Sequence, residues 1–282
     1  MRNQPLYILT EDLNFFYLIK CELDKYRIHF QILDLDSRIP EIPSIILTTS
    51  NDYKKLGNKN RVNYLIYTKN IDFGKYFLHV IAAVRIGYKK YYSTLTFSID
   101  PGKKLGLMVF LDDYYLDSYC CFENSYFFAT IQKYIDAFGD NNPTLMKLNF
   151  KLGRGVLDIT YDLVKQIYFM FENRKNLGVC LIDEFKSSQF RFSGNGIGKK
   201  FTKDEISALI LAFRLGIEVR FENFEDIFEQ LKMKKFFSVK TETEKPNNHD
   251  ETLLSLEELV EKVLRGELSL SNATEIINAN NV

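Results

Sequence analysis

The sequence contains no tryptophan, only three histidines and four cysteines. No two cysteines stand in a C-x-x-C arrangement, and the histidines lie far apart along the chain. Structural zinc sites and disulfide frameworks depend on such spacings, so the sequence predicts neither. We expect reduced, buried thiols of the kind found in cytoplasmic proteins.

Long apolar runs and an excess of charge of either sign are also missing. No apolar run reaches the roughly 20 residues that a membrane-spanning helix needs. The first residues, MRNQPLYILTEDLNFF, soon turn polar, unlike a secretory signal. The 37 basic residues balance 37 acidic ones, so net charge gives no argument for a nucleic-acid or membrane partner. We therefore expect a cytoplasmic protein with no membrane partner.

The first 90 residues alternate between strand-like runs and helical periodicity, which predicts a small N-terminal α/β domain over residues 1–90. Its order of elements is similar to half of a flavodoxin-type or receiver-type domain. In a receiver domain, acids at strand ends bind magnesium and accept phosphate, and Asp12, Asp34 and Asp36 lie near such ends. Helix capping by Asp12 and solvated loop acids are the other interpretation. The expected strands are 5–10, 27–36, 44–50 and 62–68, and the expected helices are 11–26 and 73–88.

Residues 91–220 are predicted to form a second domain, in which three successive strands precede an alternation of helices and strands. Thr202 and Glu205 have the spacing of a capping box at the start of its last helix. The expected strands are 91–100, 106–113, 114–123, 144–153 and 177–185, and the expected helices are 125–139, 156–173 and 202–216.

Residues 221–282 are predicted to be an acidic helical tail. The polar stretch 240–252 reads as a flexible linker. Two short helices separated at Gly266 follow it, and the first carries an apolar stripe that includes Leu259 and Val263. Such a stripe favours docking on the body of the protein or on a protein partner.

Two motifs resemble those of a known family. In TFSIDPGKKLGLMVF, over 96–110, an apolar strand delivers Asp100 into a Pro-Gly turn, and KDEISALILAF, over 203–213, forms the last helix. The order of these motifs is similar to that of the RuvC-like Holliday-junction resolvases of the ribonuclease-H-like superfamily, over about 91–216. The resemblance implies an α/β fold with a ribonuclease-H-like mixed sheet flanked by helices. It also implies a homodimer that cuts branched or structured DNA with magnesium, or with manganese.

The resemblance implies that Asp100 and Asp204 are catalytic residues and metal ligands. Two-metal hydrolysis of a phosphodiester needs a shared carboxylate on a rigid frame, and a central strand holds Asp100 in place. The sequence departs from the family twice: strand 144–153 has no acid where the family carries a glutamate, and Ser207 stands where the family's last helix has a second aspartate.

A substitute for the missing acid comes from the strand at 177–185. Asp183 and Glu184 end this strand, and because neighbouring side chains alternate, only one can face the site. We assign Glu184 as the third catalytic residue. A strand end that emerges into solvent is the other interpretation.

Basic, aromatic and glycine residues interleave over 185–200, where no acid occurs. This composition is typical of contacts to a nucleic-acid backbone, and the turn after Asp100 adds two lysines. The predicted nucleic-acid-binding residues are Lys103, Lys104, Lys186, Arg191, Lys199 and Lys200.

These patterns lead to two hypotheses of function. The first is a metal-dependent nuclease, or a nuclease-derived protein, that acts on branched or structured DNA. The alternative is a catalytically eroded RuvC-like module that binds nucleic acid or a protein partner. Sugar kinases and actin-like ATPases share an Asp-x-Gly hairpin, but they need a duplicated fold and a second phosphate loop, which the first 90 residues do not supply.

Overall fold

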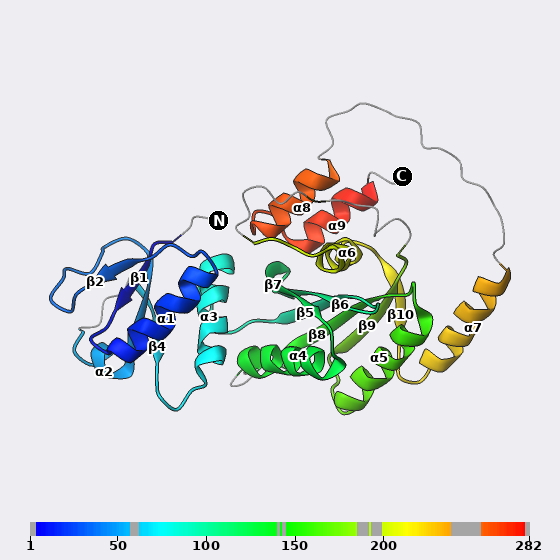
Figure 1. Cartoon of the computed structure of the whole chain (residues 1–282), viewed down its shortest axis with the longest axis horizontal. Coiled ribbons are helices and arrows are strands. Elements are labelled where there is room, and N and C mark those ends of the chain that lie inside the picture. The colour runs from blue at the N-terminus through cyan, green and yellow to red at the C-terminus, as the bar shows by residue number, and fades with distance from the viewer. Residues whose placement is uncertain are drawn as a thin grey trace.

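The computed structural model describes residues 4–56, 62–139, 142, 145–184, 192, 199–237 and 255–279, with the backbone alone for 234–237. These residues build two sheets, each with its own helices, and a C-terminal helical hairpin (Figure 1). The protein is therefore an α/β protein in which helices flank both sheets.

The first sheet has four parallel strands in the order β2-β1-β3-β4. Its two central strands, β1 and β3, are buried along their whole length, as continuous apolar runs in a parallel sheet should be. The elements of this unit are β1 (Leu6–Leu9), α1 (Leu13–Lys25), β2 (Gln31–Leu33), β3 (Ser44–Thr49), α2 (Ser50–Tyr53), β4 (Val62–Tyr67) and α3 (Phe73–Ile86).

The second sheet has six strands in the order β10-β9-β8-β5-β6-β7. Strands β5, β6 and β7 are antiparallel neighbours, β8 and β9 run parallel to β5, and β10 is antiparallel to β9. The elements are β5 (Thr94–Asp100), β6 (Leu105–Leu111), β7 (Tyr114–Cys121), α4 (Asn124–Gly139), β8 (Lys147–Gly153), α5 (Leu157–Met170), β9 (Leu177–Ile182), α6 (Lys203–Ala212), β10 (Gly216–Val219) and α7 (Phe224–Phe237).

Both faces of the second sheet are covered, and the alternation along β6 shows how. Leu107 and Val109 belong to the core that contains α4 and α5, whereas Met108 and Phe110 belong to the core that contains α6. Because successive side chains of a strand point to opposite faces, one strand contributes to both cores. Figure 1 shows α4 and α5 on one side of the sheet and α6 on the other.

The C-terminal hairpin packs on α6. Its helices α8 (Leu256–Leu264) and α9 (Leu270–Ala279) are separated at Gly266, whose φ of 71° suits glycine. The apolar stripe of α8 is buried against α6 residues such as Leu209 and Phe213. The predicted stripe therefore docks on the protein's own body (Figure 1).

The two units share one hydrophobic core through α3, which packs on β4 of the first unit and on α4 and β7 of the second. Tyr26 directly follows α1, and its hydroxyl donates a hydrogen bond to Asp117 of β7 at 2.9 Å. The first unit is therefore fixed to the second by apolar and polar contacts.

The predicted α/β class and the mixed sheet flanked by helices are confirmed, and the predicted strands and helices recur within a few residues. The strand expected over 27–36 is much shorter, because only Gln31–Leu33 pairs at the edge of the sheet. Strand β10 was not predicted. The predicted linker 240–252 lies outside the described residues. In the described part of the chain, no helix has both the length and the apolar character to cross a membrane.

Candidate functional site

Asp100 ends the central strand of the second sheet. Residues 95–99 of β5 are buried, and Asp100 itself is half-buried at the strand end. Strand β6 pairs on one side of β5 and strand β8 on the other. A carboxylate in this place is held by hydrogen-bonded backbone on both sides, so its position is rigid.

On the β6 side, Gly106 leaves room for the start of α6, which carries Asp204. Gly106 pairs directly with Asp100. A Cβ atom on Gly106 would lie 2.0 Å from the main-chain oxygen of Asp204, well inside van der Waals contact. The missing side chain therefore lets the first turn of α6, which carries Asp204, lie directly against β6.

The start of α6 is fixed by the predicted capping box. The Thr202 hydroxyl accepts from the Glu205 backbone N–H at 3.2 Å, and the Glu205 carboxylate accepts from the Thr202 N–H at 2.8 Å. Both contacts satisfy amide groups that a helix start leaves without partners. Asp204 thus sits in a well-defined first helical turn.

On the β8 side, glycines again make room for a carboxylate. Ile99 pairs with Leu152, which places Gly153 level with Asp100. A Cβ atom on Gly153 would lie 2.1 Å from Oε1 of Glu184, and one on Gly155 would lie 2.0 Å from Oε2. The Gly155 N–H donates to Glu184 Oε1 at 2.8 Å. The Glu184 side chain therefore reaches from beyond the end of β9 across β8 toward Asp100.

The pKa of Asp100 depends on its burial and on the two acids beside it. Burial, followed by the negative charges of Glu184 and Asp204, raises the pKa of Asp100 to about 7, although a hydrogen bond from Ser207 and the charge of Lys203 oppose this rise. Three acidic side chains from β5, α6 and the segment after β9 thus meet at one end of the sheet.

Ser207 and Cys120 lie beside these acids. The Ser207 hydroxyl, one turn along α6 from Asp204, makes the hydrogen bond to Asp100. Cys120 Sγ lies 3.6 Å from Asp204 Oδ2, and burial raises the pKa of this thiol, so it stays protonated and can donate. Sequence reasoning noted Ser207 only as a missing acid and did not identify Cys120.

Two further contacts anchor α6 to the sheet. Ser98 Oγ, in β5, donates to the Ala208 carbonyl oxygen at 2.7 Å. The Lys151 ammonium, in β8, donates to the carbonyl oxygens of Ala212 and Arg214, the latter at 2.9 Å. Because these carbonyls end the helix, the lysine acts as a C-terminal cap. The helix that carries Asp204 is thus tied to the strands on which Asp100 and Gly153 lie.

Asp183, the neighbour of Glu184, has a different environment. Its carboxylate lies 2.5 Å from an Arg154 guanidinium nitrogen and is exposed. The Glu184 carboxylate, in contrast, lies beside Gly153 and Gly155. The choice of Glu184 as a catalytic residue stays a prediction.

The predicted nucleic-acid-binding residues fall into three groups. Lys103 and Lys104 are exposed in the turn after Asp100, where the Lys104 ammonium lies 4.7 Å from the ring centroid of Phe122. Lys200 is also exposed. Lys199 instead lies 3.0 Å from the Glu205 carboxylate and 3.6 Å from that of Asp117. The remaining two, Lys186 and Arg191, lie outside the described residues.

In the N-terminal unit, Glu11 and Asp52 share the Lys55 ammonium, at 2.5 and 3.5 Å. Asp12 caps α1, since its carboxylate accepts from the backbone N–H groups of Asn14 and Phe15, as the capping interpretation predicts. The buried acid of this unit is Asp52, which accepts from the hydroxyls of Thr10 and Thr49 at 2.6 and 2.8 Å. Sequence reasoning missed Asp52, which stabilises the strand ends.

Within the described ranges, no three His, Cys, Asp or Glu side chains stand in the arrangement of a metal site. The acids around Asp100 nevertheless present oxygen donors of the kind that hard divalent cations bind. Comparisons of the chain with protein-family models and with curated proteins found no match in either set.

Proposed function

We propose that residues 91–220 form a ribonuclease-H-like domain and that it hydrolyses phosphodiester bonds with magnesium or manganese. The strand order supports the fold: β5 is central, antiparallel β6 and β7 lie on one side, and parallel β8 and β9 lie on the other. This is the order that a resemblance to the RuvC-like family implies, and α6 lies where that family has its last helix.

The observation that carries the proposal is the meeting of Asp100, Glu184 and Asp204, which come from three separate elements. Burial and the negative charges of Glu184 and Asp204 raise the pKa of Asp100. A divalent cation bound here would offset the repulsion among the three carboxylates. Asp100 is the shared ligand in this proposal, with Asp204 and Glu184 at its two sides. When bound, the metal would polarise the phosphate and lower the pKa of the attacking water.

In this proposal Glu184 takes the place of the glutamate that the family carries on its fourth strand. The family carries a glutamate on the strand that corresponds to β8, and this chain has Gly153 there, level with Asp100. Glu184 passes over Gly153 and Gly155 and brings a carboxylate to the same side of Asp100 from the neighbouring strand. In this proposal the third acid has moved to another strand, while Ser207 still stands in place of the family's second helical aspartate.

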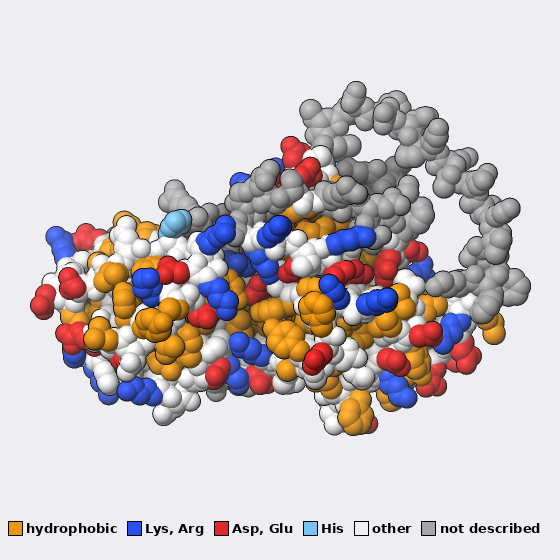
Figure 2. Space-filling model, in the orientation of Figure 1, with side chains coloured by type: hydrophobic (Ala, Val, Ile, Leu, Met, Phe, Trp, Pro, Cys, Tyr) orange, Lys and Arg blue, Asp and Glu red, His pale blue; other side chains and the backbone are white. Residues whose placement is uncertain are grey.

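Branched or structured DNA is the substrate that the family resemblance favours. Lys103, Lys104, Lys200 and Lys203 are exposed near the carboxylates, where they can contact backbone phosphates. On the face in Figure 2, Lys and Arg side chains are spread along the middle of the molecule, where the two units meet. The homodimer that the resemblance implies stays a prediction, for which light scattering of the purified protein is the direct measurement.

A catalytically eroded module that binds nucleic acid or a protein partner is the second candidate. Ser207 favours it, because a hydroxyl takes the place of the family's second helical acid and cannot supply its negative charge. Cys120 beside Asp204 adds a neutral thiol to the same region. This candidate predicts nucleic-acid or protein binding without cleavage.

Cleavage of labelled four-way junctions, flaps, duplexes and single strands, in magnesium or in EDTA, tests the proposal. We expect magnesium-dependent cutting by the natural chain. Asp100→Asn and Glu184→Gln should each reduce the rate at least about 100-fold, because each removes a charge from the metal-binding set. Asp183→Asn is the matched control, since it changes the adjacent acid, which pairs with Arg154, and should keep the natural rate.

Two results would contradict the nuclease proposal. Tight, salt-sensitive binding of DNA with no cutting in magnesium or manganese would favour the eroded module. A loss of activity in Asp183→Asn as large as that in Glu184→Gln would show that the assigned carboxylate is wrong.

A further inference from the structure

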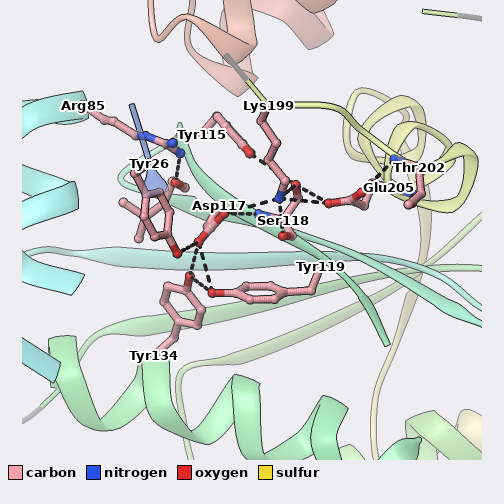
Figure 3. A network of polar contacts seen from close by, with 11 residues as sticks. Tyr26, Arg85, Tyr115, Asp117, Ser118, Tyr119, Tyr134, Lys199, Thr202 and Glu205 are labelled. Carbon is pink, nitrogen blue, oxygen red and sulfur yellow. Dashed lines mark hydrogen bonds and ion pairs between the residues drawn. The ribbon is translucent and has the colours of Figure 1, made fainter. Parts of the chain in front are cut away.

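A pocket lies apart from the acids around Asp100, where the N-terminal unit meets the sheet of the second unit. Its volume is about 310 Å³, at the lower end of the range for small-ligand sites. Figure 3 shows how side chains from α1, α3, β7 and the segment before α6 converge there. The lining residues are Lys25, Tyr26, Arg85, Asp117, Ser118, Tyr119 and Lys199.

Arg85 brings a positive charge into this pocket, where the carboxylate of Asp117 favours it. Its guanidinium donates to the Leu116 carbonyl oxygen and makes a hydrogen bond with Tyr115. It also lies over two rings, 5.2 Å from the centroid of Tyr115 and 5.9 Å from that of Tyr26. Burial lowers the pKa of Arg85, but Tyr115 and the negative charge of Asp117 raise it further, so the guanidinium stays charged. The acid that favours it forms its own hydrogen bonds to other groups, so an added anion would stabilise this buried cation further.

Asp117 is the one acid among the described residues that line the pocket, and both of its oxygens accept hydrogen bonds. The hydroxyls of Tyr26 and Tyr119 donate to its Oδ2 at 2.9 and 3.1 Å, and Tyr134 follows at 3.4 Å. The Ser118 N–H donates to Oδ1 at 2.8 Å. Burial raises the pKa of all three tyrosines, so their hydroxyls stay protonated and keep donating. This carboxylate is therefore satisfied without Arg85.

Two lysines add to the positive charge of the pocket. Lys25 lies at the exposed end of α1, where its ammonium is 3.5 Å from Glu22. Lys199 enters from the other side, and although it pairs with Asp117 and Glu205, it also donates to the Ser118 hydroxyl at 2.8 Å (Figure 3). Three cations from three segments thus surround one acid, whose hydrogen bonds are complete.

We propose that this pocket binds a phosphomonoester of about mononucleotide size, with the Arg85 guanidinium as the main contact to the phosphate. A planar guanidinium offers parallel N–H donors that match two phosphate oxygens, and Lys25 and Lys199 supply further charge. A hollow of this volume accepts one phosphate with its attached group and is too small for a nucleic-acid duplex. The phosphate can belong to a free nucleotide or to the phosphorylated end of a strand.

Calorimetric titration of the full chain in EDTA tests this proposal, because no metal-dependent reaction can then contribute. The probes are inorganic phosphate, adenosine 5′-monophosphate, adenosine, and a short oligonucleotide with and without a 5′-phosphate. We expect saturable binding of the phosphorylated probes and at least tenfold weaker binding of their unphosphorylated counterparts. Equal affinity for the mononucleotide and the phosphorylated oligonucleotide indicates end recognition; preference for the mononucleotide indicates a free nucleotide. Either result supports the binding of a phosphomonoester in this pocket.

A matched pair of variants on one helix locates the binding site. Lys25→Ala should weaken binding about two- to fivefold, the effect of an exposed charge worth up to about 1 kcal/mol. Lys20→Ala, which removes another exposed α1 lysine with an intrahelical acid partner, should leave the affinity unchanged. Arg85→Lys keeps the charge but loses the planar fork, so it should weaken binding about tenfold or more. Its thermal unfolding shows whether the fold is retained.

The proposal is overturned if no phosphorylated probe binds at millimolar concentration, or if Lys20→Ala weakens binding as much as Lys25→Ala does. Equal binding of adenosine and its monophosphate would also overturn it. Because these measurements use no magnesium and no cleavage, their failure leaves the nuclease proposal untouched, and failure of the nuclease assay leaves the pocket untouched.

Discussion

Two glycines beside Asp100 decide how close the other acids can come. Gly106 pairs with Asp100 on β6 and receives the first turn of α6, and Gly153 lies level with Asp100 on β8 and receives the Glu184 side chain. A Cβ atom would lie 2.0 Å from the Asp204 carbonyl oxygen at Gly106 and 2.1 Å from Glu184 Oε1 at Gly153. Any other residue would therefore displace the start of α6 or the Glu184 carboxylate. The glycines are therefore part of the candidate site, although neither has a functional group.

Gly153→Ala tests this role at the level of one methyl group. The new Cβ would take the place of the Glu184 carboxylate, so we expect cleavage to fall about 10- to 100-fold while the protein stays folded. Combining Gly153→Glu with Glu184→Ala returns a carboxylate to the family's position on β8. This double variant should cut faster than Glu184→Ala alone. Natural rates in Gly153→Ala would show that Glu184 has no role in cleavage.

The pKa of Asp100 gives a stability prediction that needs no substrate. Its folded-state value of about 7 exceeds its ordinary value of 3.8, so between these values the folded chain binds more protons here than the unfolded chain. Stability contributed by protonated Asp100 is therefore present below about pH 4 and is lost as pH rises to about 7.

Asp100→Asn removes this loss because the amide does not ionise. In EDTA, we expect the variant and the natural chain to differ little in unfolding free energy at pH 4. At pH 8 the variant should be more stable by about 1–3 kcal/mol. Urea denaturation at each pH measures the difference. A difference in unfolding free energy that stays constant from pH 4 to pH 8 would mean that burial and the neighbouring acids do not raise the pKa of Asp100.

The residues of the site differ in how well the sequence predicts them. Asp100 and Asp204 are predicted from motifs, whereas the alternation of side chains along a strand allows only one of Asp183 and Glu184 to face Asp100 and does not decide which. The roles of Gly106 and Gly153 depend on the register between strands, which is fixed by tertiary pairing and leaves no local signal. Lys199 was grouped with the loop cations, but it pairs with Glu205 and donates to Ser118 of β7, which are tertiary contacts that leave no local signal.

At the scale of secondary structure, α6 is the element on which the site depends. Ser98 holds its middle and Lys151 caps its end, while the capping box fixes its start. Residues 151–155, at the end of β8 and just after it, contribute here through Lys151 as well as through Gly153 and Gly155. Burial lowers the pKa of Lys151, yet its donors find carbonyl oxygens, which offsets part of the cost of burying the charge.

Lys151→Met should weaken the attachment of α6. The variant fills similar space but leaves the carbonyl oxygens of Ala212 and Arg214 without their donor, which should cost about 1–3 kcal/mol of unfolding free energy. Lys147→Met changes an exposed lysine on the same strand and should change stability by less than about 0.5 kcal/mol. Urea denaturation compares the two, and equal effects would argue against the capping role.

Elements with a long apolar period were predicted well, whereas the short and mostly exposed strand β10 was not. Helices α3, α4 and α5 each run for several turns with a buried face, so their pattern is visible in the sequence. Strand β10 has four residues, three of them exposed, and gives no period to detect. It forms because β9 offers it an unpaired edge, which is a property of the assembled sheet.

At the scale of the whole molecule, one helix joins the two units. Helix α3 is apolar on most of its circumference, with Val80, Ile81 and Ala82 all buried. The sequence indicates that such a helix is surrounded, but not by what. In the structure it lies between the first sheet and the α4–β7 side of the second, and its Arg85 reaches the pocket between the units. The N-terminal unit therefore supplies part of a wall that the second unit cannot build alone.

The central claim is that Asp100, Glu184 and Asp204 hold a divalent cation at the end of the second sheet. Soaking crystals of the protein in manganese and recording anomalous diffraction tests this most directly, because manganese binds the same oxygen ligands as magnesium and scatters anomalously. We predict a strong anomalous peak within about 2.0–2.4 Å of an Asp100 carboxylate oxygen, and its loss in Asp100→Asn crystals. A soak at tens of millimolar manganese that leaves this position without a peak would contradict the account.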